Sequence, residues 1–336
     1  MRAERNGFDR AAMPGFRRTR RLRRSAAMRE LVRETSIGPG DFIQPLFVTH
    51  GAGVRREIGS MPGQFQFSVD QLPREIAELA EVGVKAVLLF CIPEEKDREA
   101  SGAFAPDGVV QRALRTIKRE MPEMLTIGDV CGCEYTDHGH CGVLDGCEVD
   151  NDRTVDLLVR IAVSQADAGA DIVAPSDMMD GRVQAIREAL EANGLSDVMI
   201  LSYAAKYASA FYGPYRDAVG SAKALTGDKK TYQMDYANSD EALREVAMDI
   251  SEGADAVMVK PGMLYLDIVR RVSETFKVPT FAYQVSGEYS MMRAAMANGW
   301  LDEERAILES LHAFKRAGAA GVLSYFAPQA ARLLGR

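Results

Sequence analysis

The stretch Glu252-Gly-Ala-Asp-Ala-Val-Met-Val259 ends a helix-like segment at a glycine and passes at once into an apolar, β-branched run. The same junction recurs at Glu81-Val-Gly-Val-Lys-Ala-Val-Leu-Leu-Phe90, Asp167-Ala-Gly-Ala-Asp-Ile-Val173 and Arg316-Ala-Gly-Ala-Ala-Gly-Val-Leu323. Glycine accepts the left-handed conformation that often ends a helix. A continuous apolar run is typical of a strand buried on both faces. The repeated junction therefore predicts helix-to-strand units of a parallel sheet.

Strand-like runs of this kind occur eight times, separated by helical patterns such as residues 155–168 and 302–317. We expect the strands at Phe42–Val48, Ala86–Phe90, Leu125–Val130, Asp171–Ala174, Val198–Tyr203, Ala256–Val259, Thr280–Tyr283 and Gly321–Tyr325. Eight such units fit a closed (β/α)8 TIM barrel, an α/β fold. A doubly wound parallel sheet is the second interpretation.

The composition indicates one large folded domain with an extension. The chain has 336 residues, of which 47% are apolar and 26% charged, as is ordinary for a globular protein. No linker rich in Pro, Gly or Ser divides residues 35–336, so we assign that range to the barrel and residues 1–34 to an N-terminal arm. Residues 207–235 are too long for a simple turn between a strand and a helix, and we predict that they form an active-site lid.

The arm is basic, whereas the chain as a whole has a formal charge of −7. Residues 1–30 contain ten arginines against three acidic residues. A basic arm on an acidic body favours contact with a neighbouring subunit. The arm lacks the interleaved aromatic residues and the reader motifs of nucleic-acid-binding proteins, so we expect no nucleic acid partner.

The apolar runs and the cysteines limit the cellular context. The longest apolar run, residues 86–92, is far shorter than the roughly 20 residues of a membrane-spanning helix. No apolar segment near Met1 resembles a secretory signal, so we expect a cytoplasmic protein with no membrane partner. The five cysteines do not make a disulfide scaffold, and three of them crowd between residues 131 and 141. We interpret Cys91 as a core residue and Cys147 as an unliganded loop thiol.

The crowded stretch reads Asp129-Val-Cys-Gly-Cys-Glu-Tyr-Thr-Asp-His-Gly-His-Cys-Gly142. Cys131, Cys133 and Cys141 can converge on one soft or borderline cation such as zinc. Three protein ligands leave a fourth position open for water or substrate, which is typical of a catalytic zinc site. Two alternatives stay open: His138 and His140 could complete a closed structural shell, or the cysteines could be reduced and unmetallated.

Two lysines emerge from buried strands at the end of the barrel where catalytic residues lie. Lys206 follows the fifth expected strand, and Lys260 ends the sixth. Burial and a second nearby cation both disfavour a charged amine, and a neutral amine can form a Schiff base with a carbonyl substrate. Alternatively, either lysine pairs with a carboxylate such as Asp129 or Asp177, which lie near the ends of the third and fourth expected strands.

Other polar side chains near the same strand ends suit a substrate with carboxylate groups. Ser286 and Tyr325 supply hydroxyl donors at the last two expected strands. The predicted lid carries four cations, which are Arg216, Lys223, Lys229 and Lys230. An exposed loop would have the same composition, so the lid cations alone are a weak indication.

Taken together, these motifs resemble the porphobilinogen synthase family, also called the 5-aminolevulinate dehydratases. The resemblance covers residues 15–333. Besides the cysteine segment, it is carried by Ala174-Pro-Ser-Asp-Met-Met-Asp-Gly-Arg182, Ser202-Tyr-Ala-Ala-Lys-Tyr-Ala-Ser209, Phe211-Tyr-Gly-Pro-Tyr-Arg-Asp217, Met258-Val-Lys-Pro-Gly-Met263 and Tyr283-Gln-Val-Ser-Gly-Glu288.

The resemblance implies a TIM barrel whose arm wraps a partner subunit, assembled as a homo-octamer. It implies that two molecules of 5-aminolevulinate condense to porphobilinogen with loss of two waters, in tetrapyrrole synthesis. Lys260 would form a Schiff base with the substrate that supplies the propionate side, and Lys206 with the acetate-side substrate. We expect Asp129 and Asp177 to assist proton transfers.

The resemblance also implies the ligands of substrate and metal. Ser286 and Tyr325 match the propionate-side carboxylate ligands, and Arg216, Lys229 and Gln233 match those on the acetate side. Lys229 replaces the arginine most often found there, which exchanges a bidentate fork for a point charge. The three cysteines match the zinc-dependent branch of the family.

A second metal is implied away from the catalytic centre. Glu245 and Asp249 resemble the pattern of an allosteric magnesium site, although acids four residues apart on a helix are more often plain surface charge. A lysine-dependent aldolase is the alternative function, but it would not explain a second lysine beside a cysteine cluster.

Overall fold

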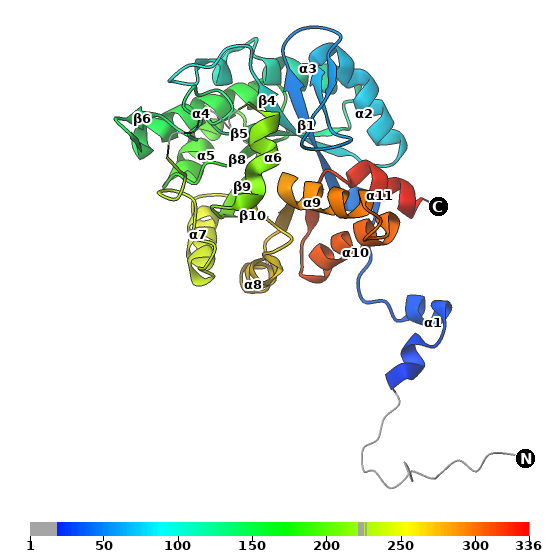
Figure 1. The fold of residues 1–336 in the computed structure, drawn as a ribbon. Helices are drawn as coiled ribbons and strands as arrows, with labels where there is room; N and C mark the ends of the chain where they lie inside the picture. Colours follow the sequence, from blue (N-terminus) through cyan, green and yellow to red (C-terminus); the bar gives the residue numbers. More distant parts are fainter. Residues whose placement is uncertain (1–18, 221–224, 226, 336) are drawn as a thin grey trace, which may run out of the picture. The chain divides into compact units, whose positions relative to one another are not determined.

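The computed structural model describes residues 19–220, 225 and 227–335 (Figure 1). The chain divides into two units, residues up to Ser36 and residues from Ile37 onward, and each is described by itself. In the first unit, η2 (Thr19–Arg23) precedes α1 (Ala26–Leu31), and Ser25 caps α1 by accepting a hydrogen bond from Met28 N at 3.1 Å. Residues 1–18 of the predicted arm lie outside the described residues.

The second unit is a closed barrel of eight parallel strands. They are β1 (Phe42–Thr49), β4 (Ala86–Ile92), β5 (Leu125–Val130), β8 (Ile172–Pro175), β9 (Met199–Lys206), β10 (Ala256–Lys260), β11 (Thr280–Gln284) and β12 (Gly321–Ser324). Each pairs with the next in this order, and β12 pairs back onto β1 through Phe42↔Val322. The prediction of a (β/α)8 barrel is confirmed, and the doubly wound sheet is excluded by this closure.

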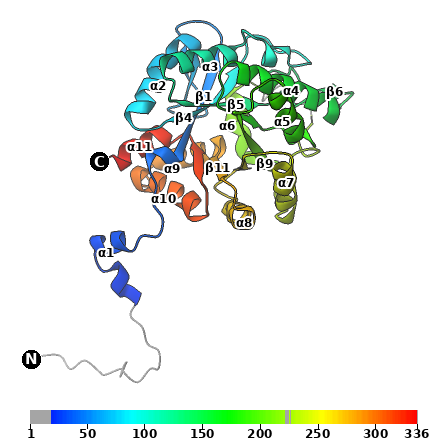
Figure 2. The same cartoon turned by 180° about the vertical axis from the view of Figure 1, so that it is seen from behind.

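Helices surround the strands, as the two opposite views in Figures 1 and 2 show. They are α2 (Leu72–Glu81), α3 (Val109–Glu120), α4 (Asn151–Asp167), α5 (Arg182–Ala192), α6 (Gly213–Ala218), α7 (Asp240–Ser251), α8 (Leu266–Phe276), α9 (Ser286–Ala297), α10 (Glu303–Arg316) and α11 (Ala327–Leu334). Short 3-10 turns η3 (Pro39–Asp41), η4 (Val69–Gln71), η5 (Ser101–Phe104) and η6 (Ala210–Tyr212) interrupt the connections.

The helix-to-strand junctions have the backbone that the sequence predicts. Their glycines have positive φ angles: 85° at Gly83, 100° at Gly169, 107° at Gly253 and 103° at Gly318. A residue with a Cβ is strained in this conformation, so glycine lets each helix stop and the chain turn into the next strand. Among the described residues, no helix is both long and apolar enough to cross a lipid bilayer.

Two small β structures were not expected from the sequence. β2 (Arg55–Glu57) pairs antiparallel with β3 (Phe65–Ser68), which extends the sheet beside β1. β6 (Leu144–Asp145) and β7 (Glu148–Val149) form a separate hairpin that follows the cysteine stretch. Both are too short to carry an alternating apolar pattern that sequence reasoning can detect.

A bulge in β9 sets the direction of its last residues. Val257 of β10 pairs with Ser202, and Val259 pairs with Ala205, so β9 uses three residues where β10 uses two. Successive side chains in a regular strand point to opposite faces, and an extra residue reverses that alternation. The bulge therefore brings Lys206 opposite Lys260 at the carboxyl end of the barrel.

Candidate functional site

Chemically active side chains collect at the carboxyl ends of the barrel strands, where the loops that follow the strands meet. Those predicted from the sequence come from six strand ends: Asp129 and the cysteines at β5, Asp177 after β8, Lys206 on β9, Lys260 on β10, Ser286 after β11 and Tyr325 after β12. All of them are buried. The fold therefore places side chains that are distant in sequence at one end of the barrel.

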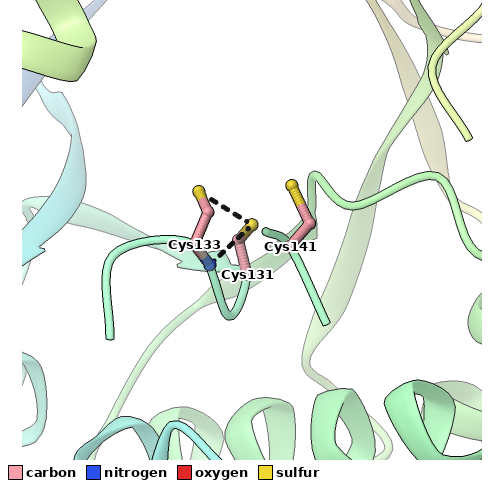
Figure 3. Close-up of side chains that lie close together, drawn as sticks. All are labelled: Cys131, Cys133 and Cys141. Carbon is pink, nitrogen blue, oxygen red and sulfur yellow. Dashed lines mark hydrogen bonds between the residues drawn. The ribbon is translucent and has the colours of Figure 1, made fainter. Parts of the chain in front are cut away.

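The three cysteines converge in the loop after β5 (Figure 3). Their sulfur atoms all lie within 4.8 Å of one another, and the Sγ atoms of Cys131 and Cys133 are 3.2 Å apart. Figure 3 shows the three sulfurs on the same side of the loop. The exposed fractions are 1% for Cys131, 7% for Cys133 and 0% for Cys141, so the sulfurs form a buried ligand set.

Two glycines allow the chain to fold this tightly around the sulfurs. A Cβ on Gly132 would lie 2.7 Å from the carbonyl oxygen of Cys141, and one on Gly142 would lie 2.2 Å from the hydroxyl of Thr154. The Gly132 amide instead donates a hydrogen bond to the Cys141 carbonyl at 3.0 Å. Close backbone approach thus brings residue 141 beside residues 131 and 133.

The donor set fits a soft or borderline metal ion, because it consists of converging sulfur ligands. Within the described ranges, Cys131, Cys133 and Cys141 are the potential metal ligands that lie close enough together to bind one ion. His138 contacts the carbonyl of Arg98 at 3.3 Å, and His140 Nδ1 lies 3.1 Å from the Tyr232 hydroxyl. Neither histidine joins the cysteine group, so the closed four-ligand alternative finds no support in this geometry.

Lys260 lies in a cage of aromatic rings. Its Nζ is 4.7 Å from the ring centre of Tyr283 and 5.0 Å from that of Tyr203, and the rings of Tyr212, Tyr215 and Phe90 lie within 5.9 Å. Burial, followed by the positive charge of Lys206, lowers the pKa of Lys260 to about 8. A substantial fraction of this amine is therefore neutral near physiological pH.

Lys206 behaves differently from its neighbour. Its amino group donates a hydrogen bond to the carbonyl of Ser176. Burial acts to lower the pKa of Lys206, but the sulfur of Cys141, followed by those of Cys131 and Cys133, outweighs burial and raises it. The sequence led us to expect that the lysines depress each other, and this lowering is found at Lys260 and not at Lys206. The reason is the cysteine cluster beside Lys206.

Two buried carboxyl groups lie near the amines. Asp129 accepts a hydrogen bond from the Ser176 hydroxyl at 3.0 Å, and burial raises its pKa although Lys260 and Lys206 act against this. Burial raises the pKa of Asp177 to about 6, against the attraction of Arg182. Neither lysine has a carboxylate within 4.0 Å among the described residues, so the simple ion-pair alternative is not what the structure shows.

Hydroxyl groups line the neighbouring strand ends. Tyr325 shares a 2.7 Å hydrogen bond with the hydroxyl of Tyr283, whose ring belongs to the cage around Lys260. Ser286 begins α9, and its hydroxyl accepts a hydrogen bond from the Tyr215 amide at 3.0 Å. Both hydroxyls therefore lie close to the Lys260 side of the site.

The described residues of the segment 207–235 include both buried and exposed polar side chains. Arg216 is half-buried on α6, and Gln233 is buried with its side-chain oxygen unpaired among the described residues. Lys229 donates to the sulfur of Cys141 at 3.3 Å, so here it contacts the cysteine cluster. Lys230 is exposed beside Asp228, and Lys223 lies outside the described residues.

The residues expected at an allosteric magnesium site lie on α7. Asp249 is 3% exposed, and its two oxygens accept hydrogen bonds from Arg182, both at 3.0 Å. The hydroxyl of Ser202 donates to the same carboxylate at 2.6 Å. Asp249 is thus the partner of a buried arginine, whereas Glu245 is half-buried beside a pocket of about 560 Å³. A magnesium role for this pair stays a prediction.

Comparison with known proteins identifies the family. The family model described as delta-aminolevulinic acid dehydratase matches residues 16–333 of the chain. The chain belongs to the delta-aminolevulinic acid dehydratase family. It is 58% identical over 319 residues to the delta-aminolevulinic acid dehydratase of Bradyrhizobium diazoefficiens, covering 94% of this chain and 90% of the relative. The enzyme of that name from Halalkalibacterium halodurans is 53% identical, with coverage of 95% and 97%.

A solved structure extends the comparison to three dimensions. The delta-aminolevulinic acid dehydratase, or porphobilinogen synthase, of Toxoplasma gondii was crystallised in complex with the reaction product porphobilinogen. It superimposes with a TM-score of 0.93 at 46% identity, covering 95% of this chain and 92% of that one. As a member of the dehydratase family, the chain is an enzyme of the lyase class.

Sequence reasoning missed three groups of this dehydratase site. Ser176 joins Asp129 to Lys206, Tyr203 contributes to the Lys260 cage, and Glu134 accepts the Tyr215 hydroxyl at 2.6 Å. Burial raises the pKa of Glu134 to about 8. Ser176 and Tyr203 stand inside stretches that carried the family resemblance, so their place at strand ends was an available signal. Glu134 lies next to Cys133 and gave no signal of its own.

Proposed function

We propose that the chain condenses two molecules of 5-aminolevulinate to porphobilinogen with loss of two waters, a step of tetrapyrrole synthesis. One observation carries the proposal: two buried lysines face each other in register at neighbouring strand ends, beside a buried cluster of three cysteines. Membership of the family and the likeness to a product complex support the same reaction.

In the proposed mechanism, neutral Lys260 attacks the ketone carbon of the first substrate, and the carbonyl oxygen leaves as water when the Schiff base forms. Its low pKa makes the free amine available, and the aromatic cage excludes competing water. Ser286 and Tyr325 would bind the carboxylate of this propionate-side substrate, because their hydroxyls lie on the Lys260 side of the site.

Lys206 would hold the second substrate in the same way. Arg216 and Gln233 would bind the acetate-side carboxylate, together with Lys229 once the sulfurs no longer hold its ammonium group. Asp129 lies near both amines and hydrogen-bonds Ser176, which places it to accept and return protons as the carbon–carbon and carbon–nitrogen bonds form. Asp177 would assist from the neighbouring loop.

We propose that Cys131, Cys133 and Cys141 bind zinc. The three side chains are buried, and each offers one sulfur ligand. When bound, zinc would supply an electrophilic position for a substrate or water at its fourth site. Holding both substrates in one geometry is itself worth several kcal/mol of barrier.

Assembly, location and the second metal follow from the family resemblance. We propose a homo-octamer with the arm on a partner subunit, and magnesium at Glu245 and Asp249. The five cysteines are unpaired, and Cys147 is exposed, which suits the reducing cytoplasm that we propose as the location.

Chemical trapping tests the proposal. Borohydride reduction in the presence of 5-aminolevulinate should attach the substrate to Lys260, detected by peptide mass mapping. Lys260→Ala should lower the rate of porphobilinogen formation by about 10³-fold or more, because the first substrate would have no amine at that position with which to form a Schiff base. Lys85→Ala is the matched control, since Lys85 is exposed at the opposite end of the barrel before β4. A wild-type protein that carries no adduct at Lys260 would contradict the Schiff-base mechanism.

A further inference from the structure

The loop that carries the cysteines is tied to α6 by one buried side chain. Glu134 follows Cys133 directly and is 1% exposed. One oxygen of its carboxyl group accepts a hydrogen bond from the backbone amide of Cys91 on β4 at 2.6 Å. The other oxygen accepts a hydrogen bond from the hydroxyl of Tyr215, also at 2.6 Å. Glu134 therefore bridges a barrel strand and α6.

Tyr215 makes three contacts from its place in α6. Its hydroxyl reaches Glu134, its backbone amide donates to Ser286 at 3.0 Å, and its ring centre lies 5.4 Å from the Lys260 amine. The next residue in the chain is Arg216. Through one residue, α6 is connected to the metal loop, to the Schiff-base lysine and to groups proposed to bind substrate carboxylates.

The other end of α6 is held by apolar packing of Ala218 and Val219 in the core and by hydrogen bonds to their carbonyl groups. Gln66 donates to the carbonyl of Ala218 at 2.8 Å, and Lys96 donates to that of Val219 at 2.9 Å. Lys96 also interacts electrostatically with Glu134 and Cys133, so charge attraction connects this end of α6 to the cysteine loop as well. The Glu134–Tyr215 hydrogen bond joins the residue next to a cysteine ligand directly to a side chain of α6.

We propose that Tyr215 is a positioning residue that transmits metal binding at the cysteine loop, through Glu134, to the substrate-binding groups Arg216 and Ser286. This inference rests on the proposed function for its substrate and for zinc as the metal. A bound ion fixes Cys133, and because Glu134 is peptide-bonded to Cys133 and anchored on Cys91, its carboxylate is fixed as well. The 2.6 Å hydrogen bond then holds the Tyr215 hydroxyl to this fixed carboxyl group, so Tyr215 follows the loop.

Hydrogen–deuterium exchange tests the link without any substrate. The measured quantity is the exchange rate of the peptide that covers Gly213–Ala218, in zinc-loaded and in chelator-treated protein. We expect zinc to slow this exchange about tenfold in the wild type, which is the effect of stabilising one hydrogen bond. Tyr215→Phe keeps the ring in the Lys260 cage and removes the hydroxyl, so it should bind zinc normally while exchange in α6 becomes independent of zinc.

Two further variants make the result specific. Tyr207→Phe is the matched control, because its buried hydroxyl at the same end of the barrel donates to the carbonyl of Asn238 and not to the metal loop; it should keep the zinc effect. In Glu134→Gln one oxygen is replaced by an amide group that cannot accept a bond, so the zinc effect should weaken. Adding Glu134→Gln to Tyr215→Phe should have no further effect, because both act through one contact.

Steady-state kinetics give an independent readout. Tyr215→Phe should raise KM for 5-aminolevulinate about tenfold and change kcat much less, because the groups that it positions bind substrate carboxylates. Zinc-dependent exchange that survives in Tyr215→Phe, or its absence from the wild type, would overturn the inference, and so would an unchanged KM. A wild type that forms no porphobilinogen yet shows the exchange effect would refute the proposed function and leave the link intact.

Discussion

Replacing Lys206 with methionine should shift the reactivity of its neighbour to higher pH. The positive charge of Lys206 is the second cause, after burial, of the lowered pKa of Lys260. Without that charge, the pKa of Lys260 should rise above about 8 but stay below the ordinary value near 10.5, because burial remains. Lys206→Arg keeps a positive charge in the same region, so its pH profile should resemble that of the wild type.

The size of the effect follows from the fraction of neutral amine. With a pKa of about 8, about one tenth of Lys260 is neutral at pH 7, whereas an ordinary lysine has roughly 0.03% in that form. At pH 7, Lys260 thus has about 300 times more of the neutral, nucleophilic form than an ordinary lysine has.

The assay is the initial rate of reductive trapping of 5-aminolevulinate on Lys260, measured by peptide mass mapping between pH 6 and 9.5. Cyanoborohydride serves as the reductant, because it works over this range. The wild-type rate should rise about tenfold per pH unit and then level off near pH 8. A wild-type rate that still rises at pH 9.5 would refute the lowered pKa. Identical profiles for the methionine variant and the wild type would refute the role of the neighbouring charge.

Three other outcomes are expected. Chelation should stop porphobilinogen formation and added zinc should restore it; activity in protein shown by metal analysis to be zinc-free would contradict the cysteine site. Gly132→Ala should destabilise the cysteine loop by about 1–3 kcal/mol, since its Cβ meets the Cys141 carbonyl, and zinc titration should show weaker binding. Gly40→Ala, which has open space, is the control. Asp249→Asn should lower the free energy of unfolding in urea by about 1–3 kcal/mol, because Arg182 loses its nearest carboxylate and keeps Asp177 at 3.5 Å as a partner. If wild type and variant differ in stability only when magnesium is added, the result would support the proposed role of Asp249 as a magnesium ligand and contradict its role as the partner of Arg182.

The barrel was predictable because its signals are local. Each junction glycine and the apolar run after it lie within about ten residues. The positive φ angles at Gly169 and Gly253 confirm that these glycines adopt the left-handed conformation that ends a helix. The cysteine site was also readable, because its ligands lie within 11 residues around Gly132. Local patterns of this kind need no knowledge of the tertiary contacts.

The remaining features depend on contacts between distant segments. β9 continues to Lys206 although the sequence suggested an end at Tyr203, because Ala204 and Ala205 have little strand preference of their own. The raised pKa of Lys206 comes from sulfurs that lie some 70 residues earlier in the chain. The spacing of Glu245 and Asp249, four residues apart, is typical of acidic residues on the surface of a helix. The arginine that Asp249 binds, Arg182, lies far away in the sequence, so no local pattern indicates the pair.

The irregular pairing of β9 makes the number of residues as important as their identity. Ser202 faces Arg182 and Asp249, while Tyr203 and Lys206 both lie beside Lys260, a spacing of three that regular alternation forbids. Deleting Ala204 would restore strict alternation and turn the amine of Lys206 outward, toward the helices. Alanine scanning preserves the spacing and would never reveal this requirement. A redesign of the enzyme by loop shortening or strand grafting must therefore keep the interval from Tyr203 to Lys206 at its present length.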